Sequence, residues 1–569
     1  MNQENLLLKS RIFLLTTFAH GMTLKEAIMV FNIFPIWTLI YSYSYGLGIR
    51  NILKTENDFH TSLTNISNSS GICHRKMKVP SLELWSISSE DVLAELPVDA
   101  VRENDVRKVQ NCIFSAVYPT PFISSVQLIA ASEDVLENLL DLDISVTKSN
   151  IFLQFVSGMK TIPGFVPLAH RYGGHQFGFW AGQLGDGRAH LIGIYTNRFG
   201  ERWELQLKGS GRTPYSRLVV SNDVVWRDQF YNGNITKERG AVVLRVAKSW
   251  FRIGSLEILT LSREFALLRK LVDFIIKEHF PSISIDDPNR VLAFFSNVVS
   301  ETAYLIAMWM SVGFAHGVCN TDNFSLLSIT IDYGPFGFME SYNPDYVPNT
   351  SDDEGRYKIG NQATVGMFNL NKLLLALTPI MDTRQKQLAA QVLEVFPAMY
   401  YRRFTELFSA KLGFLDSSEE DMTLIASFLY LMEDTKSDFT MTFRQLGEVT
   451  QDQLQNLTIP QEYWALRDVS LHKNFPEWVK MYLQRLKRNP DDSESKRRQR
   501  MATTNPRYVL RNWMAESAVR KATTNDFSEV QLLLKTLRKP FQKQKLAEEA
   551  GYSDRTPEWA KDLKVSCSS

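Results

Sequence analysis

Polar and apolar residues alternate along the first half of the folded region. In ERWELQLKGSG (201–211), Trp203, Leu205 and Leu207 fall on one face of a strand, and Lys208 ends the opposite face. A solvent-facing lysine and a phosphate-binding lysine both fit that position. The alternation therefore predicts a half-buried strand that carries Lys208 at its end.

Helical spacing dominates the second half of the chain. Val299, Ala303, Ile306 and Met310 recur every three or four residues, and a similar apolar stripe runs through 388–399. Both stripes are expected to face the core. A β-rich first half followed by helices indicates an α+β fold with more than one lobe.

The segment HGVCNTDNFSLLSITIDYG (316–334) follows the first of these helices and holds two polar sites around one apolar run. The run 324–331 predicts a short strand or hairpin that brings Asp322 and Asn323 close to Asp332. Asp and Asn oxygens suit Mg²⁺, which binds few protein ligands and completes its shell with water and phosphate. The segment therefore predicts a site for a metal and a nucleotide.

A glycine-rich segment, RYGGHQFGFWAGQLGDGRAHLIGIY (171–195), precedes the Lys208 strand. Glycine at this density lets backbone amides approach a ligand closely. The dinucleotide-binding GxGxxG fingerprint opens a helix, whereas this segment opens a strand. It predicts a glycine-rich hairpin over phosphates, and kinases set a strand lysine on nucleotide phosphates in the same order.

Two arginines, Arg245 and Arg252, lie seven residues apart in an apolar stretch. Guanidinium groups bind phosphate with planar paired donors, so the two would suit a triphosphate. A pair of structural ion pairs fits the same spacing equally well.

The order of these motifs describes a two-lobed protein-kinase-like fold, with Asp332-Tyr333-Gly334 where a kinase has DFG. One departure is clear. A kinase separates its base from its metal-binding Asn, as in HRDxxxxN, whereas Asn323 directly follows Asp322. An ordinary protein kinase is therefore disfavoured.

Long ordered motifs identify the chain as similar to the selenoprotein O family of pseudokinases. They are YGGHQFGFWAGQLGDGRA, ERWELQLKGSGRTPYSR, GAVVLRVA, HGVCNTDN, TIDYGPFGFME, SDDEGRY and NPRYVLRNW, and the resemblance runs from about residue 82 to the C-terminus. Members bind ATP in a flipped orientation. The resemblance implies a protein adenylyltransferase that transfers AMP from ATP to Ser, Thr or Tyr hydroxyls of proteins and releases pyrophosphate.

The resemblance also implies the organisation of the chain. A β-rich N-lobe is expected at 82–255, a helical C-lobe at 256–500 and a helical C-terminal extension at 501–569. The region 1–81 has no counterpart in the family and is expected to be a targeting or poorly ordered region. By family analogy the protein would be mitochondrial, with redox-related protein substrates.

Each candidate residue takes a role from the resemblance. Asp322 would accept the proton of the incoming hydroxyl, and Asn323 and Asp332 would bind Mg²⁺. Cys567 stands where some members carry selenocysteine, which implies a redox role. The residues expected to contact ATP are Gly185, Gly187, Arg188, Lys208, Arg245, Arg252 and Asp332.

One family element is missing. After Arg217 the family continues into a helix whose glutamate orients the strand lysine, whereas this chain continues with VVSNDVVWRDQFYNGN. A lysine without that carboxylate is poorly held. The alternative function is therefore a catalytically inactive scaffold that binds partners through its helical lobe.

Composition and charge limit the partners and structural classes that the chain is expected to have. The formal net charge is +1, from 63 basic and 62 acidic residues, and the basic run at 496–500 lacks interleaved aromatics, so nucleic acid is not an expected partner. Four widely spaced cysteines indicate neither a zinc site nor a disulfide framework. The uncharged segment 27–49 is long enough to span a bilayer, but Asn32 and Pro35 weaken it, and a membrane anchor is not expected.

Overall fold

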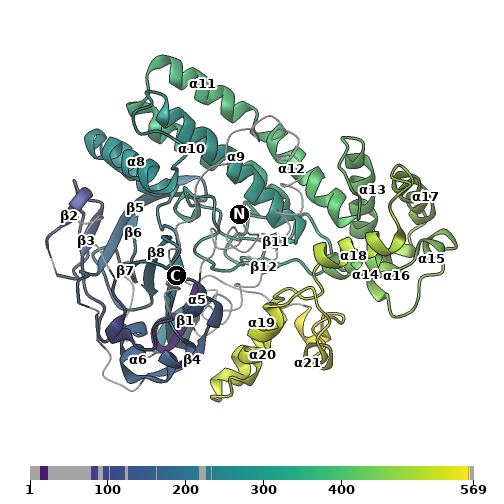
Figure 1. Cartoon of the computed structure of the whole chain (residues 1–569), viewed down its shortest axis with the longest axis horizontal. Helices are drawn as coiled ribbons and strands as arrows, with labels where there is room; N and C mark the ends of the chain where they lie inside the picture. The colour runs from purple at the N-terminus through teal and green to yellow at the C-terminus, as the bar shows by residue number, and fades with distance from the viewer. Residues whose placement is uncertain are drawn as a thin grey trace, which may run out of the picture.

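The computed structural model describes residues 13–23, 78–87, 94–101, 103–121, 126–161, 163–216, 226–231, 234–561 and 563. These residues form an α+β fold, with a large mixed sheet at one end and helices over the rest of the molecule (Figure 1). The α+β prediction is confirmed at this level. The domain boundaries at residues 81, 255 and 500 stay predictions.

Ten described strands make up the large sheet, in the order β2-β3-β5-β7-β8-β10-β1-β4, with β6 paired to β5 and β9 paired to β10. Only β2 and β3 pair in parallel among these strands. The strands are β1 (Phe13–Thr23), β2 (Val98–Asp99), β3 (Phe114–Ala116), β4 (Gln127–Ala131), β5 (Leu168–Gln176), β6 (Phe179–Gly185), β7 (Ala189–Thr196), β8 (Arg202–Lys208), β9 (Trp226–Tyr231) and β10 (Asn234–Ala247).

Strand β8 forms as its alternation predicts. Trp203, Leu205 and Leu207 are fully buried on one face. Lys208 ends the strand, opposite Ala189 of β7 and Val243 of β10. The register of the three central strands therefore fixes where the Lys208 side chain begins.

Part of the expected N-terminal region belongs to the sheet. Phe13–Thr23 forms β1, which pairs antiparallel with β10 on one side and β4 on the other. The apolar segment 27–49 lies outside the described residues.

Short helices flank the sheet: η1 (Leu82–Leu84), α5 (Glu133–Asn138), η2 (Ile144–Lys148) and α6 (Asn150–Val156). The longer helices follow β10. In chain order the first of these are α7 (Ile253–Leu261), α8 (Phe265–His279), α9 (Arg290–Ser311), α10 (Gln362–Leu377), α11 (Thr383–Glu394) and α12 (Phe396–Lys411), with η4 (Ile359–Asn361) and η5 (Thr378–Ile380) beside α10. A small two-stranded sheet joins β11 (Phe314–Ala315) to β12 (Gly337–Phe338).

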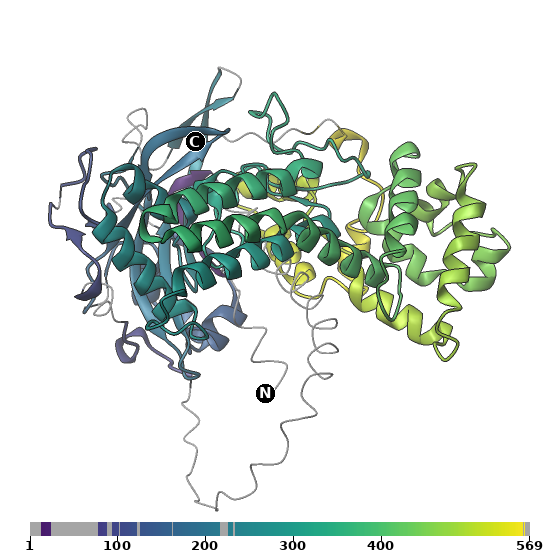
Figure 2. The same ribbon diagram turned by 90° about the horizontal axis from the view of Figure 1, so that it is seen from above.

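The far end of the molecule is entirely helical among the described residues (Figure 2). It comprises α13 (Asp421–Asp434), α14 (Phe439–Glu448), α15 (Gln451–Gln455), α16 (Trp464–Ser470), α17 (Phe475–Leu486) and α18 (Glu494–Thr504). The chain then returns toward the sheet through α19 (Asn512–Thr523), α20 (Ser528–Leu537), α21 (Lys545–Glu549) and η6 (Glu558–Ala560). In α20, Gln531 Nε2 donates to the carbonyl oxygen of Ile129 in β4 at 2.7 Å.

One apolar core joins the sheet to α7–α12 and α19–α20, and a second lies within the far helices. Two described helical stretches, α9 and 359–380, are long and apolar enough to cross a membrane. In α9 most of that length is buried inside the protein, where the helix packs against α10, α11 and α12. This packing is typical of a core helix.

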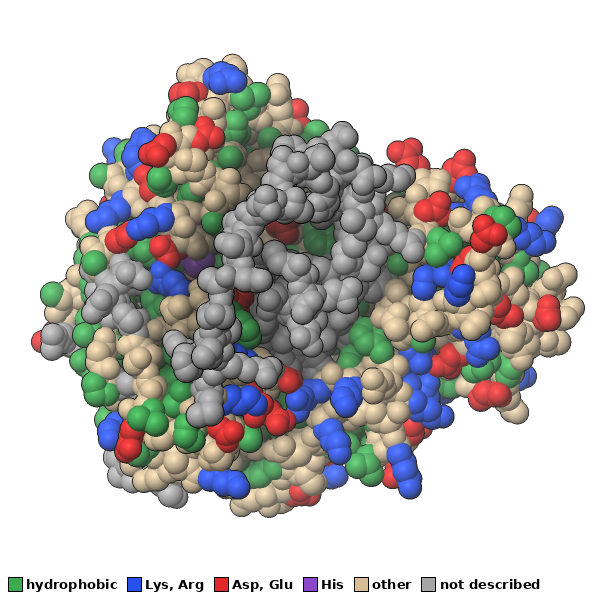
Figure 3. All heavy atoms as spheres, in the orientation of Figure 1, with side chains coloured by type: hydrophobic (Ala, Val, Ile, Leu, Met, Phe, Trp, Pro, Cys, Tyr) green, Lys and Arg blue, Asp and Glu red, His purple; other side chains and the backbone are tan. Residues whose placement is uncertain are grey.

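Charged side chains of both signs are interspersed over the described surface that Figure 3 presents. The basic run 496–500 forms part of α18, and the side chain of Arg497 is buried there. Its guanidinium donates to the carbonyl oxygens of Leu446 and Val449. That arginine therefore stabilises the helical end, whereas Lys496, Arg498 and Gln499 of the same run are exposed.

Candidate active site

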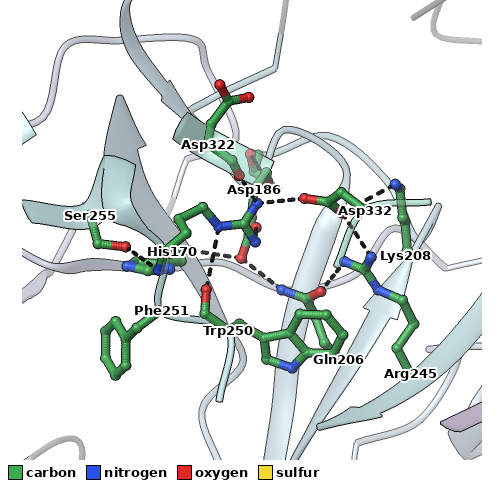
Figure 4. Close-up of polar contacts among 12 residues, drawn as sticks. His170, Asp186, Gln206, Lys208, Arg245, Trp250, Phe251, Ser255, Asp322 and Asp332 are labelled. Carbon is green, nitrogen blue, oxygen red and sulfur yellow. Dashed lines mark hydrogen bonds and ion pairs between the residues drawn. The ribbon is translucent and has the colours of Figure 1, made fainter. Parts of the chain in front are cut away.

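The carboxylate of Asp332 lies at the centre of three cations. Its Oδ1 is 2.8 Å from Nη1 of Arg245 and 3.4 Å from Nζ of Lys208, and its Oδ2 is 2.5 Å from Nη1 of Arg252 (Figure 4). Lys208 ends β8, Arg245 belongs to β10, and Arg252 directly precedes α7. Elements far apart in the sequence thus bring together four of the predicted site residues.

The electrostatics of Asp332 follow from this arrangement. Burial raises its pKa, but the charges of the three neighbouring cations oppose burial and hold the pKa well below its usual range. Its backbone φ is +51°, a left-handed conformation that aspartate tolerates better than most residues. Asp332 is therefore a permanently charged group that gathers cations.

Arg252 links the two acidic positions of the site. It is 1% exposed, and its Nη1 also donates to the backbone oxygen of Asp322 at 2.8 Å. The guanidinium lies 4.2 Å from the ring centre of Tyr172 in β5, which is a cation–π contact. A single buried arginine thus connects the hairpin, the Asp322 loop and Asp332.

Two further polar residues complete this network, and the sequence reasoning missed both. Asp186 Oδ2 accepts hydrogen bonds from Gln206 Nε2 at 2.9 Å and from the backbone of His170 at 3.1 Å. Gln206 in turn accepts from Arg245. Two features of the sequence could have identified these residues. Asp186 lies inside the string GDGR, and strand alternation places Gln206 on the same face as Lys208.

Asp322 differs sharply from Asp332. It lies in the short helical turn η3 (Thr321–Asn323), and its carboxylate points away from the arginine cluster (Figure 4). Burial raises its pKa to about 6, against the lowering effects of a hydrogen bond from Gln176 and the charge of Arg252. Its Oδ1 is buried and has no hydrogen-bond partner among the described residues. An elevated pKa and one unsatisfied oxygen suit a proton acceptor.

The run 324–331 folds back as expected but forms no regular strand. A single antiparallel bridge joins Phe324 to Thr330, and Ser325 bridges back to Arg252. This turn brings the Asp322 loop and Asp332 to opposite sides of one arginine.

The glycine-rich segment forms the predicted hairpin, β5–β6, followed by the turn 185–188 into β7. A Cβ at Gly185 would lie 2.4 Å from the ring of Tyr215, and one at Gly187 would lie 3.2 Å from its carbonyl oxygen. Packing against Tyr215 thus explains both glycines. The backbone oxygen of Arg188 accepts from Gly209 just beyond Lys208, so this turn lies beside the lysine. Contact of the three residues with ATP stays a prediction.

The fit of Mg²⁺ depends on Asn323 and Asp332. Asn323 donates its amide nitrogen to the backbone oxygen of Val318 at 2.9 Å, which orients the side chain and leaves its oxygen for a ligand. Among the described residues, no three or more His, Cys, Asp and Glu side chains are grouped to hold a metal. Two protein oxygens supplemented by phosphate and water are typical of Mg²⁺ sites. Both oxygens of Asp332 are paired with cations here, so Mg²⁺ binding by these two residues stays a prediction.

The remaining predictions for the site concern the helix after Arg217 and the cysteines. Between Lys208 and β10 the described residues form no helix, and Lys208 pairs with Asp332. Cys567 lies outside the described residues. Cys319, three residues before Asp322, is buried, and burial raises the pKa of its thiol.

Comparison with known proteins gives a family. The profile described as "Protein adenylyltransferase SelO" matches residues 100–220 and 217–538. The two matched segments meet at 217–220, where the sequence pattern predicts that a helix of the family is missing. A protein nucleotidyltransferase YdiU of Xanthomonas axonopodis pv. citri is 38% identical over 514 residues, covering 84% of this chain and 98% of the relative.

Similar figures hold for two other bacterial relatives with the same name. That of an Azoarcus strain is 37% identical over 516 residues, covering 84% of this chain and 98% of its own. That of Methylobacillus flagellatus is 37% identical over 516 residues, covering 84% and 97%. The family resemblance read from the motifs is confirmed: this chain belongs to the SelO family of protein adenylyltransferases.

Proposed function

We propose that this protein transfers AMP from ATP to Ser, Thr or Tyr hydroxyls of protein substrates, with pyrophosphate as the leaving group. The observation that carries the proposal is the separation of two carboxylates by Arg252. Asp332 faces three cations, and Asp322 faces away from them with one oxygen unpaired. A cation cluster beside a proton acceptor is what in-line attack on a phosphorus requires.

The architecture supports a kinase-like reading of the site. The sheet carries Lys208 and Arg245, the helical part carries the Asp322 loop, and Arg252 lies where the two meet. This corresponds to a β-rich N-lobe and a helical C-lobe with nucleotide bound between them. The adjacency of Asp322 and Asn323 is the departure that favours AMP transfer over phosphoryl transfer.

In the proposed reaction one bond to the α-phosphorus forms and one breaks. The acceptor oxygen bonds to the α-phosphorus, its proton passes to Asp322, and the bond from the α-phosphorus to the bridging oxygen breaks to release pyrophosphate. Lys208, Arg245 and Arg252 neutralise the charge of the phosphates. To do so, they must replace at least part of their contacts with Asp332 by contacts with the nucleotide. Bound Mg²⁺, held by Asn323 and Asp332, would supply further neutralisation.

The decisive experiment uses ATP labelled at the α or the γ position, incubated with the purified chain, Mg²⁺ and α-casein as a general acceptor. Label incorporated from the α position alone supports AMP transfer. Label incorporated from the γ position alone identifies phosphoryl transfer and refutes the proposal.

A second candidate, an inactive binding scaffold, is favoured by one observation. Lys208 pairs with Asp332, and no described glutamate side chain lies within 4.0 Å of its Nζ. A scaffold that has lost nucleotide binding would show no rise in melting temperature with MgATP, whereas a binding-competent enzyme must be stabilised. The transcript across Arg217 and Leu218 would show whether the natural message encodes the helix.

The proposal also covers the location of the protein in the cell and its protein substrates. Mitochondrial location and redox-related substrates rest on the motif resemblance, whereas the relatives reported above are bacterial. Fractionation of cells that express the full chain tests the location directly.

A further inference from the structure

The tip of the β5–β6 hairpin lies against the loop that carries Asp322. The backbone N–H of His175 donates to Oγ1 of Thr321 at 2.7 Å, and that of Phe177 donates to Oδ1 of Asn320 at 3.3 Å. These contacts join neighbouring residues of the hairpin to neighbouring residues of the loop. The loop therefore takes its position from the hairpin as well as from its own turn.

The side chain between these two contacts reaches the catalytic carboxylate. Gln176 Nε2 donates to Oδ2 of Asp322 at 3.1 Å. The other oxygen, Oδ1, faces Gly174, where a Cβ would lie only 2.3 Å away. One oxygen is thus held by an amide, and the other is buried against a glycine of the same strand, where any Cβ would displace it.

The hairpin itself is anchored on both sides. Nδ1 of His175 lies 2.6 Å from a carboxylate oxygen of Glu257, which is buried in α7. The N–H of Phe177 also donates to the hydroxyl of Tyr357 at 2.8 Å, and the two rings are 5.1 Å apart. These anchors fix the position of Gln176, so its amide presents a preset donor to Asp322.

We propose that Gln176 is a positioning residue for AMP transfer: its bond to Oδ2 fixes the orientation in which the carboxylate of Asp322 accepts the proton of the substrate hydroxyl. The proposal rests on the proposed function. Without the Gln176 amide the carboxylate can rotate, and the oxygen aimed at the hydroxyl is no longer defined.

Three variants of the full chain test this role. Gln176→Met keeps length and volume but removes the donor, and kcat for α-label transfer to α-casein should fall about tenfold or more with KM for ATP unchanged. Gln176→Lys restores a donor and should recover much of that loss, whereas a packing role would make lysine the worse replacement. Gln183→Met is the matched control. It removes an amide of the same hairpin that bonds to Val109 and Arg107.

A second measurement does not depend on turnover. Hydrogen exchange in a peptide that spans 316–323 should be faster in Gln176→Met than in the wild type and unchanged in Gln183→Met. A wild-type chain that transfers no AMP refutes the proposed function alone, and exchange then decides on Gln176. The positioning role is overturned by unchanged kcat in Gln176→Met, by equal losses in both Met variants, or by unchanged exchange in an inactive chain.

Discussion

Two aspartates ten residues apart in the sequence are placed in opposite environments. Burial raises the pKa of Asp322 to about 6, whereas three cations hold that of Asp332 well below its usual range. Carboxyl groups separated in this way divide the tasks of a site, because one can take up a proton and the other keeps its charge. The division agrees with the roles proposed for the two residues.

Substitution of Asp322 by asparagine tests its role. Asn keeps the shape of the side chain but accepts no proton, so we expect α-label transfer to fall about 10²-fold to 10⁴-fold. Asp353→Asn, at an exposed acidic position of the 343–358 loop, is the control and should leave the rate unchanged. Transfer by Asp322→Asn within threefold or so of wild type would remove Asp322 from the mechanism.

For single residues, the sequence predicted which charged side chains belong to the site but not the polar residues that contact them. Lys208, Arg245, Arg252 and Asp332 converge as their spacing and the kinase-like order suggested. Gln176 lay in the glycine-rich string without a predicted role, because its contact with Asp322 joins residues 146 positions apart. Contacts of that kind depend on how the hairpin packs on the loop, which local patterns do not encode.

Among the elements, the hairpin is the one whose packing bears most directly on catalysis. Gly174→Ala would place a Cβ 2.3 Å from Oδ1 of Asp322, so the carboxylate or the strand must shift. We expect kcat to fall about tenfold or more, because displacements of about 1 Å at a reacting group cost this much.

The control for the glycine variant is Gly182→Ala, on the other strand of the hairpin. Its Cβ would meet nothing within 4 Å, although its φ of +81° adds strain. Loss of stability in both variants with loss of kcat in Gly174→Ala alone is the expected pattern. Equal kcat in the two variants would contradict it.

A buried lysine at the end of α12 predicts a pH dependence of stability. Lys411 is 2% exposed, its ammonium lies 4.3 Å from the ring centre of Phe443, and burial lowers its pKa to about 7. The unfolded chain therefore binds more protons between about pH 7 and pH 10, and this group makes stability rise with pH across that window.

Lys411→Met should remove this dependence. In urea unfolding, the variant should exceed the wild type in free energy of unfolding at pH 6.5, and the difference should shrink by at most about 1.4 kcal/mol per unit as pH rises toward 9.5. A difference that does not vary with pH would mean that Lys411 stays charged in the folded protein.

Helices and strands with one buried apolar face could be predicted from the sequence. The alternation in β8 and the stripe in α9 were read correctly because each has one apolar face. The stripe at 388–399 crosses two helices, α11 and α12, which part at Val395 beside Pro397. Strand β1 was missed, since its flanks resembled a targeting region and its partners lie far away in the sequence.

Across the whole molecule, the C-terminal extension ties the helical end to the sheet. Arg511, before α19, is 1% exposed and binds Glu340 after β12 and Asp438 before α14. Arg538, after α20, reaches Asp134 of α5 at 2.9 Å, and about a third of its side chain is exposed. The bonds of Arg511 join residues 171 and 73 positions apart and the bond of Arg538 joins residues 404 positions apart, and the two arginines differ in burial.

That difference in burial sets unequal stability effects. Arg511→Met leaves the buried carboxylate of Asp438 and the partly exposed carboxylate of Glu340 without their arginine, and should lower the free energy of unfolding by about 3–5 kcal/mol. Arg538→Met removes a pair whose side chains are about a third exposed and should cost about 1 kcal/mol or less. Chemical denaturation of the full chain at one pH and salt concentration measures both. If the two losses are equal, the extension is held mainly by apolar packing of α19 and α20, and the buried arginine does not fasten it to the helical end.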